Sequence, residues 1–270
     1  MPGRVVDKIA IVMGGGQTPG ETIGNGRATA MLLAREGAHV VVADRRLDSA
    51  QDTVNMITGE GGRAFACEVD VTLEDSVRSL VAQVVERLGK IDILHNNVGA
   101  SIALGDARAD VMTVEAFDRS FAVNFKSAWL AAKHVLPVMR ERQSGSIINI
   151  SSLAAWEAYP LVGYKTMKAA LLALTENLAA ANARYGVRVN AILPGLMNTP
   201  MAIEARVAQG PSREEVIAAR NKRVPLLHQM GTAWDVAYAA LFLHSDEAKF
   251  ISGAALPVDG AAAASFGAYE

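Results

Sequence analysis

Residues 8–44 contain the sequence pattern that most restricts the fold of this chain. An apolar run from Lys8 to Met13 has the length and composition of a parallel strand buried on both faces. A glycine-rich segment follows, and helical periodicity then extends from Arg27 to Gly37. A second apolar run, His39 to Ala43, ends at Asp44. Strand, glycine-rich turn, helix, strand and acidic residue in this order predict a βαβ unit that binds a dinucleotide.

The same unit favours one cofactor over another. Glycines let the backbone approach a pyrophosphate, and the start of a helix offers free N–H groups and a favourable dipole. Asp44 lies 18 residues after Gly26, where an acidic side chain accepts hydrogen bonds from both ribose hydroxyls and repels a 2′-phosphate. We therefore expect NAD rather than NADP, although Arg45 and Arg46 could partly offset that repulsion.

Apolar runs continue to alternate with helical periodicity along the rest of the chain. No linker, repeat or low-complexity tract divides it, so we expect one domain over residues 1–270 with a single doubly wound parallel α/β sheet. Further strands are predicted at Ala64–Val69, Ile91–His95, Ser146–Ile150, Val187–Leu193 and Ala254–Val258. Further helices are predicted at about Leu73–Leu88, Phe117–Arg142, Tyr164–Arg184 and Ala233–His244.

Residues 196–230 interrupt this alternation. The segment is polar, contains Pro200, Gly210, Pro211 and Pro225, and mixes short helical patterns with loop. It follows the carboxyl end of a predicted strand, where open α/β sheets bind their ligands. A long insertion at that place predicts a lid over a substrate.

Charge and composition exclude several classes of protein. With a formal net charge of -2 over 270 residues, no basic field indicates nucleic acid or an anionic membrane as a partner. No uncharged apolar run approaches the ~20 residues that span a bilayer, and the first residues lack the layout of a signal peptide. Cys67 is the only cysteine, which indicates a reducing, cytoplasmic environment. The histidines show no metal-ligand spacing, so we expect no metal.

Tyr164 and Lys168 lie four positions apart at the start of a predicted helix, shortly after the strand that ends at Ile150. This spacing places both side chains on one face of the helix. A phenol with its ordinary pKa of about 10 is a poor acid–base catalyst at neutral pH, and a nearby ammonium lowers that pKa. Ser151 or Ser152, at the strand end, could then hold a substrate oxygen against the tyrosine.

Taken together, these residues resemble the short-chain dehydrogenase/reductase family, in its shorter branch, over residues 5–260. The motifs occur in the family's order: the glycine-rich loop, Asp70-Val71, Asn96-Asn97-Val98-Gly99, Asn124, the serine, Tyr164-x-x-x-Lys168, and Pro194-Gly195 with Thr199. The resemblance implies a Rossmann fold of about seven strands with helices on both faces. It also implies an NAD(P)-dependent oxidoreductase that acts on CH–OH groups.

The resemblance assigns roles to individual residues. Tyr164 would be the catalytic acid–base, and Lys168 would lower its pKa and bind the nicotinamide ribose. Ser152 would orient the substrate oxygen, and Asn124 would hold a water that links Lys168 to solvent. The cofactor would contact Gly14, Gly24, Asn25, Gly26, Asp44, Asp70, Val71, Asn97, Gly99, Tyr164, Lys168, Pro194, Gly195, Met197 and Thr199.

The chain departs from the family pattern in three places. Met13 replaces a threonine and the glycine-rich loop is six residues longer, with the extra residues at roughly Gln17 to Thr22. Counting from the strand indicates Ser152 as the catalytic serine, whereas counting back from Tyr164 indicates Ser151; we choose Ser152. Val98 stands where the family has alanine.

The expected function is NAD-dependent interconversion of a secondary alcohol and a ketone. Trp156, Tyr159, Leu161 and Met201 would wall a pocket for a hydrophobic or cyclic small-molecule substrate. Alternatives are an NADPH-dependent carbonyl or 3-oxoacyl-type reductase, a non-catalytic nucleotide-sensing protein, and an oligomeric scaffold with a vestigial site. By the resemblance, apolar helices would pair subunits into a homo-oligomer, a dimer or tetramer.

Overall fold

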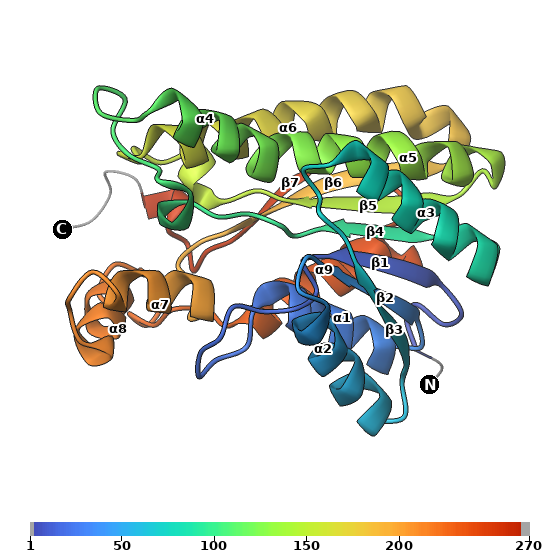
Figure 1. The fold of residues 1–270 in the computed structure, drawn as a ribbon, viewed down its shortest axis with the longest axis horizontal. Helices are drawn as coiled ribbons and strands as arrows, with labels where there is room; N and C mark the ends of the chain where they lie inside the picture. Colours follow the sequence, from blue (N-terminus) through green and yellow to red (C-terminus); the bar gives the residue numbers. More distant parts are fainter. Residues whose placement is uncertain (1–2, 266–270) are drawn as a thin grey trace.

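A computed structural model describes residues 3–265; residues 1–2 and 266–270, the ends of the expected single domain, lie outside the described part. A seven-stranded sheet has the order β3-β2-β1-β4-β5-β6-β7, and all neighbouring strands pair in parallel. Figure 1 shows this sheet between two layers of helices. The strands are β1 Ile9–Met13, β2 His39–Asp44, β3 Arg63–Glu68, β4 Ile93–Asn96, β5 Gly145–Ile150, β6 Val187–Pro194 and β7 Ala255–Val258. The expected α/β class and the seven strands are confirmed.

Strand β1 shows why the central strands read as continuous apolar runs. Its side chains alternate between two hydrophobic cores: Ile9, Ile11 and Met13 enter one, and Ala10 and Val12 enter the other. Because both faces are covered by helices, neither set of side chains can be polar without a buried partner.

Each face of the sheet has its own group of helices. The first core joins the sheet to α3 Glu74–Leu88, α5 Ser127–Glu141 and α6 Val162–Asn182. The second joins it to α1 Asn25–Arg35, α2 Leu47–Gly59 and α9 Ala233–His244. Figure 1 shows these groups above and below the sheet.

Some element boundaries differ from the predicted ones. Helix α2 lies between the second and third strands, where no helix is predicted. The long helix predicted at residues 117–142 is instead α4 Val114–Phe121, a π-helical turn at Ala122–Lys126, and α5. Helix α1 begins two residues earlier than predicted, at Asn25, because the loop glycine Gly24 already serves as its N-cap.

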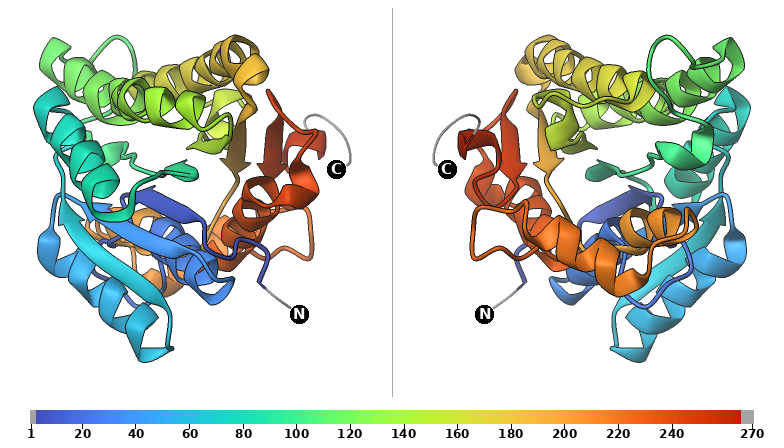
Figure 2. Two further views of the ribbon diagram at one scale, coloured as in Figure 1. Left: turned by 90° about the vertical axis from the view of Figure 1, so that its right-hand side faces the viewer. Right: turned by 90° about the vertical axis from the view of Figure 1, so that its left-hand side faces the viewer.

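Residues 196–230, the predicted lid, carry two short helices, α7 Pro200–Val207 and α8 Arg213–Asn221. Pro200 stands at the first position of α7, where its missing N–H costs no hydrogen bond, and Ser212 caps α8 in a capping box. In the right-hand view of Figure 2, both helices lie toward the viewer at one end of the sheet. Within residues 3–265, no helix is long and apolar enough to cross a membrane.

Candidate active site

The predicted site residues gather at the carboxyl ends of the strands. Strand β1 has β2 on one side and β4 on the other, so successive crossovers run to opposite sides of β1. Open α/β sheets form their ligand crevice at such a switch point. The strand ends bring together Gly14 after β1, Asp44 on β2, Asp70 after β3, Asn97 after β4, Ser151 and Ser152 after β5, and Gly195 after β6.

The glycine-rich loop is drawn tightly over the start of α1. A Cβ on Gly26 would lie only 2.0 Å from the Gly14 carbonyl oxygen, so no larger residue fits. Gly14 itself has a φ of +75°, which glycine adopts without strain. The Asn97 side-chain amide donates to the same Gly14 carbonyl at 3.1 Å and fixes the loop against β4.

The extra residues of this loop form an ordered turn closed by one side chain. The Gln17 amide donates to the Thr22 carbonyl at 3.1 Å and accepts from the Gly24 N–H at 3.0 Å. On the other side, the Gln17 N–H donates to the Ser49 hydroxyl at 2.8 Å. Arg46 also donates to the Gln17 carbonyl. The insertion is therefore tied to α1 and to α2 by hydrogen bonds.

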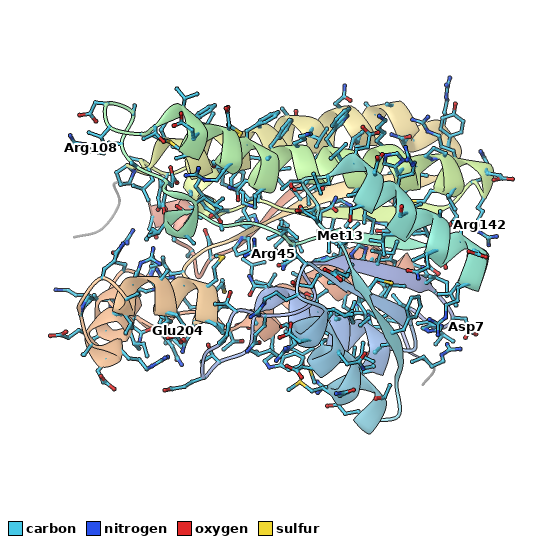
Figure 3. All side chains as sticks on the ribbon, viewed as in Figure 1. Asp7, Met13, Arg45, Arg108, Arg142 and Glu204 are labelled. Carbon is cyan, nitrogen blue, oxygen red and sulfur yellow. The ribbon has the colours of Figure 1, made fainter. Side chains whose placement is uncertain are left out.

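The tip of the insertion contacts the predicted lid. Glu21 lies 3.3 Å from the Arg213 guanidinium on α8, and that guanidinium lies 2.6 Å from Glu204 on α7. Gly20 is seated so closely against α7 that an added Cβ would lie 2.6 Å from the Glu204 carboxylate. Figure 3 labels Glu204 on α7. Sequence reasoning left the role of the insertion open; the structure shows it bridging the glycine-rich loop and residues 196–230.

Asp44 stands where the ribose ligand is expected. Its carboxylate accepts the Gly16 and Arg46 backbone N–H groups, each at 3.1 Å. These bonds orient the side chain and leave oxygen lone pairs for further donors. Arg46 is engaged with Gln17, whereas Arg45 is exposed at the same end of the sheet, near Met13 in Figure 3.

Two buried amide oxygens beside the glycine-rich loop and the β6 loop have no hydrogen-bond partner among the described residues. One belongs to Asn25, the first residue of α1, and the other to Asn198, after β6. Buried polar atoms without partners are rare, and a ligand rich in hydroxyl and amide groups would satisfy them. Together with the free N–H groups at the start of α1, they fit a dinucleotide in this crevice.

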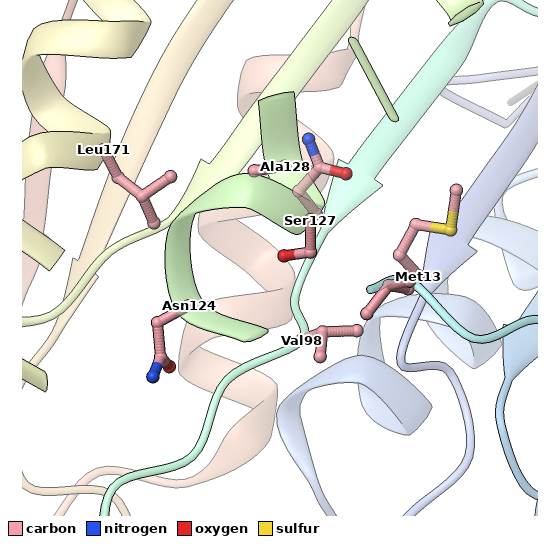
Figure 4. A pocket seen from close by; sticks show the side chains of 8 residues that line it. Met13, Val98, Asn124, Ser127, Ala128 and Leu171 are labelled. Carbon is pink, nitrogen blue, oxygen red and sulfur yellow. The ribbon is translucent and has the colours of Figure 1, made fainter. Parts of the chain in front are cut away.

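The remaining predicted cofactor contacts surround the same crevice. Asp70 holds an exposed turn by accepting the Thr72 N–H at 2.9 Å. Val71 and Val98 line a small cavity with Met13 and Asn124, which Figure 4 shows from close by. On the β6 side, a Cβ on Gly195 would lie 2.7 Å from Asp259, and the other predicted contacts there, Pro194, Met197 and Thr199, are all buried.

The structure gives the two adjacent serines different surroundings. Ser151 is buried and its hydroxyl donates to the backbone carbonyl of Lys168 at 2.6 Å. The Ser152 hydroxyl accepts the Ala154 N–H at 3.2 Å and lies near enough to the Tyr164 phenol to lower its pKa. Ser152 is thus the serine whose hydroxyl meets Tyr164, while Ser151 holds α6 to the end of β5.

Burial dominates the ionisation of the tyrosine–lysine pair. It raises the pKa of Tyr164 to about 12, against a smaller lowering by Ser152, and lowers the pKa of Lys168 to about 7. The Lys168 ammonium lies 5.5 Å from the centre of the Tyr164 ring and donates to the Ile150 carbonyl at 2.8 Å. Burial is the largest effect on both groups, and the groups that lower the tyrosine pKa are Ser152 and Arg206 rather than Lys168.

Asn124 lies in the π-helical turn, where an extra residue widens the helix. Its side chain accepts the Ala100 N–H at 3.0 Å and donates to the Ala100 carbonyl at 2.8 Å. A Cβ on Gly99 would lie 2.8 Å from the Lys168 nitrogen and 3.0 Å from the Asn124 oxygen. Asn124 and Lys168 therefore both approach the face of Gly99 where a side chain would stand.

Sequence reasoning missed Asp106, which holds the start of the helix that carries Tyr164. Its carboxylate accepts the Gly163 N–H at 2.8 Å, the Tyr164 N–H at 3.0 Å and the Ser101 hydroxyl at 2.8 Å. It is buried in the loop that follows β4. No local pattern marks it, because its helix partners lie 57 and 58 positions further along the chain.

Comparisons with known proteins identify the family. A family model described as Enoyl-(Acyl carrier protein) reductase matches residues 21–261. The 2-(R)-hydroxypropyl-CoM dehydrogenase of Xanthobacter autotrophicus is 34% identical over 95% of this chain and 98% of its own. The (+)-borneol dehydrogenase 2 of Salvia officinalis is 34% identical over 96% of this chain and 90% of its own.

A solved structure from Burkholderia xenovorans, assigned to the short-chain dehydrogenases/reductases, has the same fold. It is 39% identical with a TM-score of 0.92 and covers 97% of this chain and 98% of its own. The fold, the near-complete coverage and the dehydrogenase relatives agree with the site described above. The chain belongs to the short-chain dehydrogenase/reductase family, NAD(P)-binding oxidoreductases that act on CH–OH groups.

Proposed function

We propose that this protein is an NAD-dependent dehydrogenase that interconverts a secondary alcohol and a ketone. The observation that carries the proposal is the cluster of Ser152, Tyr164 and Lys168 at the carboxyl end of β5, on the same edge of the sheet as the Asp44 carboxylate. A bound nicotinamide ring would accept or supply the hydride.

In the oxidative direction, Tyr164, whose raised pKa keeps the phenol protonated, passes its proton toward Lys168, and the phenolate then takes the hydroxyl proton of the alcohol. Ser152, whose hydroxyl lies near the Tyr164 phenol, holds the substrate oxygen in reach of it. Lys168, with a pKa of about 7, is partly protonated near neutral pH and can pass a proton between the ribose side of the site and the space beside Asn124. Asn124 fixes the Gly99–Ala100 backbone beside that path.

The preference for NAD rests on Asp44. Its carboxylate would accept the ribose hydroxyls and repel a 2′-phosphate. Arg46 donates to the Gln17 carbonyl and so is occupied within the insertion. The second candidate, an NADPH-dependent carbonyl or 3-oxoacyl-type reductase, is favoured by one observation, the exposed guanidinium of Arg45 beside Asp44.

We further propose that residues 196–230 close over the substrate as a lid, and that the substrate is largely hydrophobic. Tyr159 lies beside Tyr164 with 6.1 Å between ring centres, and Trp156 and Met201 expose apolar side chains.

Exposed Val114, Phe121 and Trp129 on the α4–α5 layer support a homo-oligomer. Buried, unpaired Cys67 supports a cytoplasmic location.

A fluorescence titration of the purified protein with NADH and, separately, with NADPH tests the cofactor assignment. We expect tight binding of NADH and weak binding of NADPH. Tight NADPH binding would instead favour the reductase with Arg45 as the phosphate ligand. If neither nucleotide binds, the insertion disables the loop and the proposed enzyme function is wrong.

A further inference from the structure

The arginines of the lid segment differ in how their charges are balanced. Arg213 lies against two carboxylates, those of Glu21 and Glu204. Within residues 3–265, no carboxylate lies within ion-pair distance of Arg206 on α7 or Arg220 on α8. Arg206 and Arg220, like the exposed Arg223, thus have no counter-ion among residues 3–265.

Arg220 is the more constrained of the two, because only 7% of it is exposed. Its Nε donates to the Met230 sulfur at 3.2 Å and its Nη2 donates to the Met197 carbonyl at 3.4 Å, a weak acceptor and a long hydrogen bond, both to neutral groups. Its Nη1 has no partner among the described residues and is not among their fully buried unpartnered atoms, so it stays open to solvent or a ligand. A largely buried guanidinium with only two neutral acceptors gains from an anion at its free donors.

Arg220 lies beside the loop after β6, which borders the candidate active site. Met197, which it contacts, lies in the loop after β6 at the carboxyl edge of the sheet, three residues beyond Pro194. Burial, and after it the nearby positive charge of Arg206, lowers the pKa of Arg220, and Tyr159 also lies close to Arg220. Tyr159 in turn lies beside Tyr164, 6.1 Å between ring centres.

Arg206 connects the same neighbourhood to the reacting centre. It is half-buried, and its Nη1 donates to the Ala202 carbonyl of its own helix at 2.7 Å, which leaves its other donors without partners among the described residues. Its positive charge lowers the pKa of the Tyr164 phenol, whereas burial, the larger effect, raises that pKa. Two unbalanced cations therefore flank one side of the space around Tyr159 and Tyr164.

We propose that the substrate is a secondary alcohol or ketone that also carries an acidic group, a carboxylate, sulfonate or phosphate, and that Arg206 and Arg220 bind this group. The inference rests on the proposed function, because it requires that the hydroxyl or keto group of the substrate reacts at Tyr164 while the acidic group lies at the arginines. Guanidinium groups bind such anions through paired N–H donors. The apolar wall of Trp156, Tyr159 and Met201 would contact the part of the substrate between its two polar ends.

A negatively charged group could also come from the cofactor, as its pyrophosphate. The two sources predict different effects of the same substitution. Loss of Arg220 would weaken nucleotide binding if it binds the pyrophosphate. It would leave nucleotide binding nearly unchanged, and remove selectivity for acids, if it binds the substrate.

The test uses hydroxy acids in which the secondary alcohol and the carboxylate are separated by different chain lengths. 3-Hydroxybutanoate, 4-hydroxypentanoate and 5-hydroxyhexanoate are each compared with their methyl esters, which keep the shape and lose the charge. We expect wild type to prefer at least one acid over its ester by about tenfold or more in kcat/KM. Arg220→Met should lower kcat/KM for that acid by about 100-fold and for its ester far less.

Matched variants separate a specific contact from a general loss of charge or of folding. Lys222→Met removes an exposed cation of the same segment and should leave the acid-to-ester ratio unchanged. Arg220→Lys should restore part of the preference for acid, because it keeps the charge and loses the paired donors. If Arg220→Met does not fold, Arg206→Met, on the half-buried arginine, should lower the same ratio.

Each outcome decides between the alternatives. Wild type that prefers every ester over its acid would overturn the inference and leave the proposed function intact. An NADH dissociation constant raised about tenfold in Arg220→Met, with an unchanged acid-to-ester ratio, would assign the arginines to the pyrophosphate and also overturn the inference.

If no alcohol is oxidised, the proposed function fails. Calorimetry with the corresponding keto acids and keto esters on the NADH complex then decides the inference alone, tighter binding of the acids supporting it and equal binding contradicting it.

Discussion

Asp106 does two things to Tyr164 that oppose each other. It accepts the Tyr164 N–H and so fixes the start of α6, and its negative charge raises the pKa of the Tyr164 phenol, whereas Ser152 and Arg206 lower it. Asp106 thus acts on both the position and the ionisation of the acid–base, although burial is the largest cause of the raised pKa. A change that keeps one effect and removes the other can separate them.

Asp106→Asn is such a change. An amide keeps an oxygen for the Gly163 N–H and removes the negative charge that disfavours the phenolate. We expect the rising limb of the kcat/KM profile for alcohol oxidation to move to lower pH, with a modest loss of stability from the Tyr164 N–H left without its acceptor, about 1–3 kcal/mol. Asp110→Asn, on the exposed partner of Arg108, is the control and should leave the profile in place. An unshifted profile in Asp106→Asn would show that its charge does not reach the phenol.

Two glycines test whether the tight loop over α1 is needed for nucleotide binding. Gly26→Ala places a Cβ against the Gly14 carbonyl and should cost about 1–3 kcal/mol of stability and weaken NADH binding, because backbone must shift. Gly59→Ala, at the end of α2, meets no atom within 4 Å and should stabilise by about 0.4–1 kcal/mol. Chemical denaturation and NADH titration measure both. Equal NADH affinity in Gly26→Ala and wild type would contradict the close approach.

Residues with a local signal were predictable from the sequence, and those with distant partners were not. Tyr164 and Lys168 are found by their spacing on one helix, and Gly26 by its place between a strand and a helix. The choice of Ser152 over Ser151 needed the structure, because the loop to Tyr164 is one residue shorter than the family pattern. Asp106 could not be found, since only folding brings it to the start of α6.

At the scale of elements, the insertion in the glycine-rich loop joins two parts of the molecule that sequence reasoning treated separately. Gln17 closes its base, and Glu21 meets Arg213, which also holds Glu204. Both sides of the crevice, the nucleotide loop and the lid segment, thereby share one cation. Motion of the lid and order of the loop are expected to be coupled.

Arg213→Ala removes that shared cation. We expect amide hydrogen exchange to become faster both in residues 17–22 and in α7 and α8, because each carboxylate loses its partner. Arg78→Ala, which removes an exposed ion pair within α3, should change neither region. Faster exchange in α8 alone would show that the insertion and the lid are not coupled.

The strands were predictable because each is an apolar run of the right length, and all seven predicted strands are present. The helices were less predictable from the sequence than the strands. Helix α2 buries mostly small or polar side chains, Ser49, Ala50 and Thr53 among them, so its periodicity is weak. The break between α4 and α5 follows from a π-helical turn around Asn124, which no hydrophobic pattern records.

For the whole molecule, a pair of buried histidines makes the stability of the fold depend on pH. His95 on β4 lies 3.3 Å from His244 at the end of α9, and His244 lies 2.9 Å from the Ser146 hydroxyl on β5. Both rings are fully buried. Burial lowers the pKa of His95 to about 3 and the pKa of His244 well below its ordinary value.

The folded protein therefore keeps both rings neutral where the unfolded chain binds a proton on each. The free energy of unfolding should be unaffected by these groups above pH ~6.5 and should fall as pH decreases toward 3, by about 1.4 kcal/mol per pH unit for each ring. His244→Gln should reduce that slope, while His228→Gln, at an exposed position, should not. Denaturation curves between pH 4 and 7 measure it. Equal slopes in wild type and His244→Gln would contradict the assignment.

The central claim for the molecule is that Tyr164 performs acid–base catalysis on a CH–OH group with NAD. Alcohol-dependent formation of NADH, followed for wild type and Tyr164→Phe together with the NADH affinity of each, tests it most directly. We predict that the variant loses turnover by about 100-fold or more and binds NADH as wild type does. Turnover unchanged in Tyr164→Phe would contradict the claim.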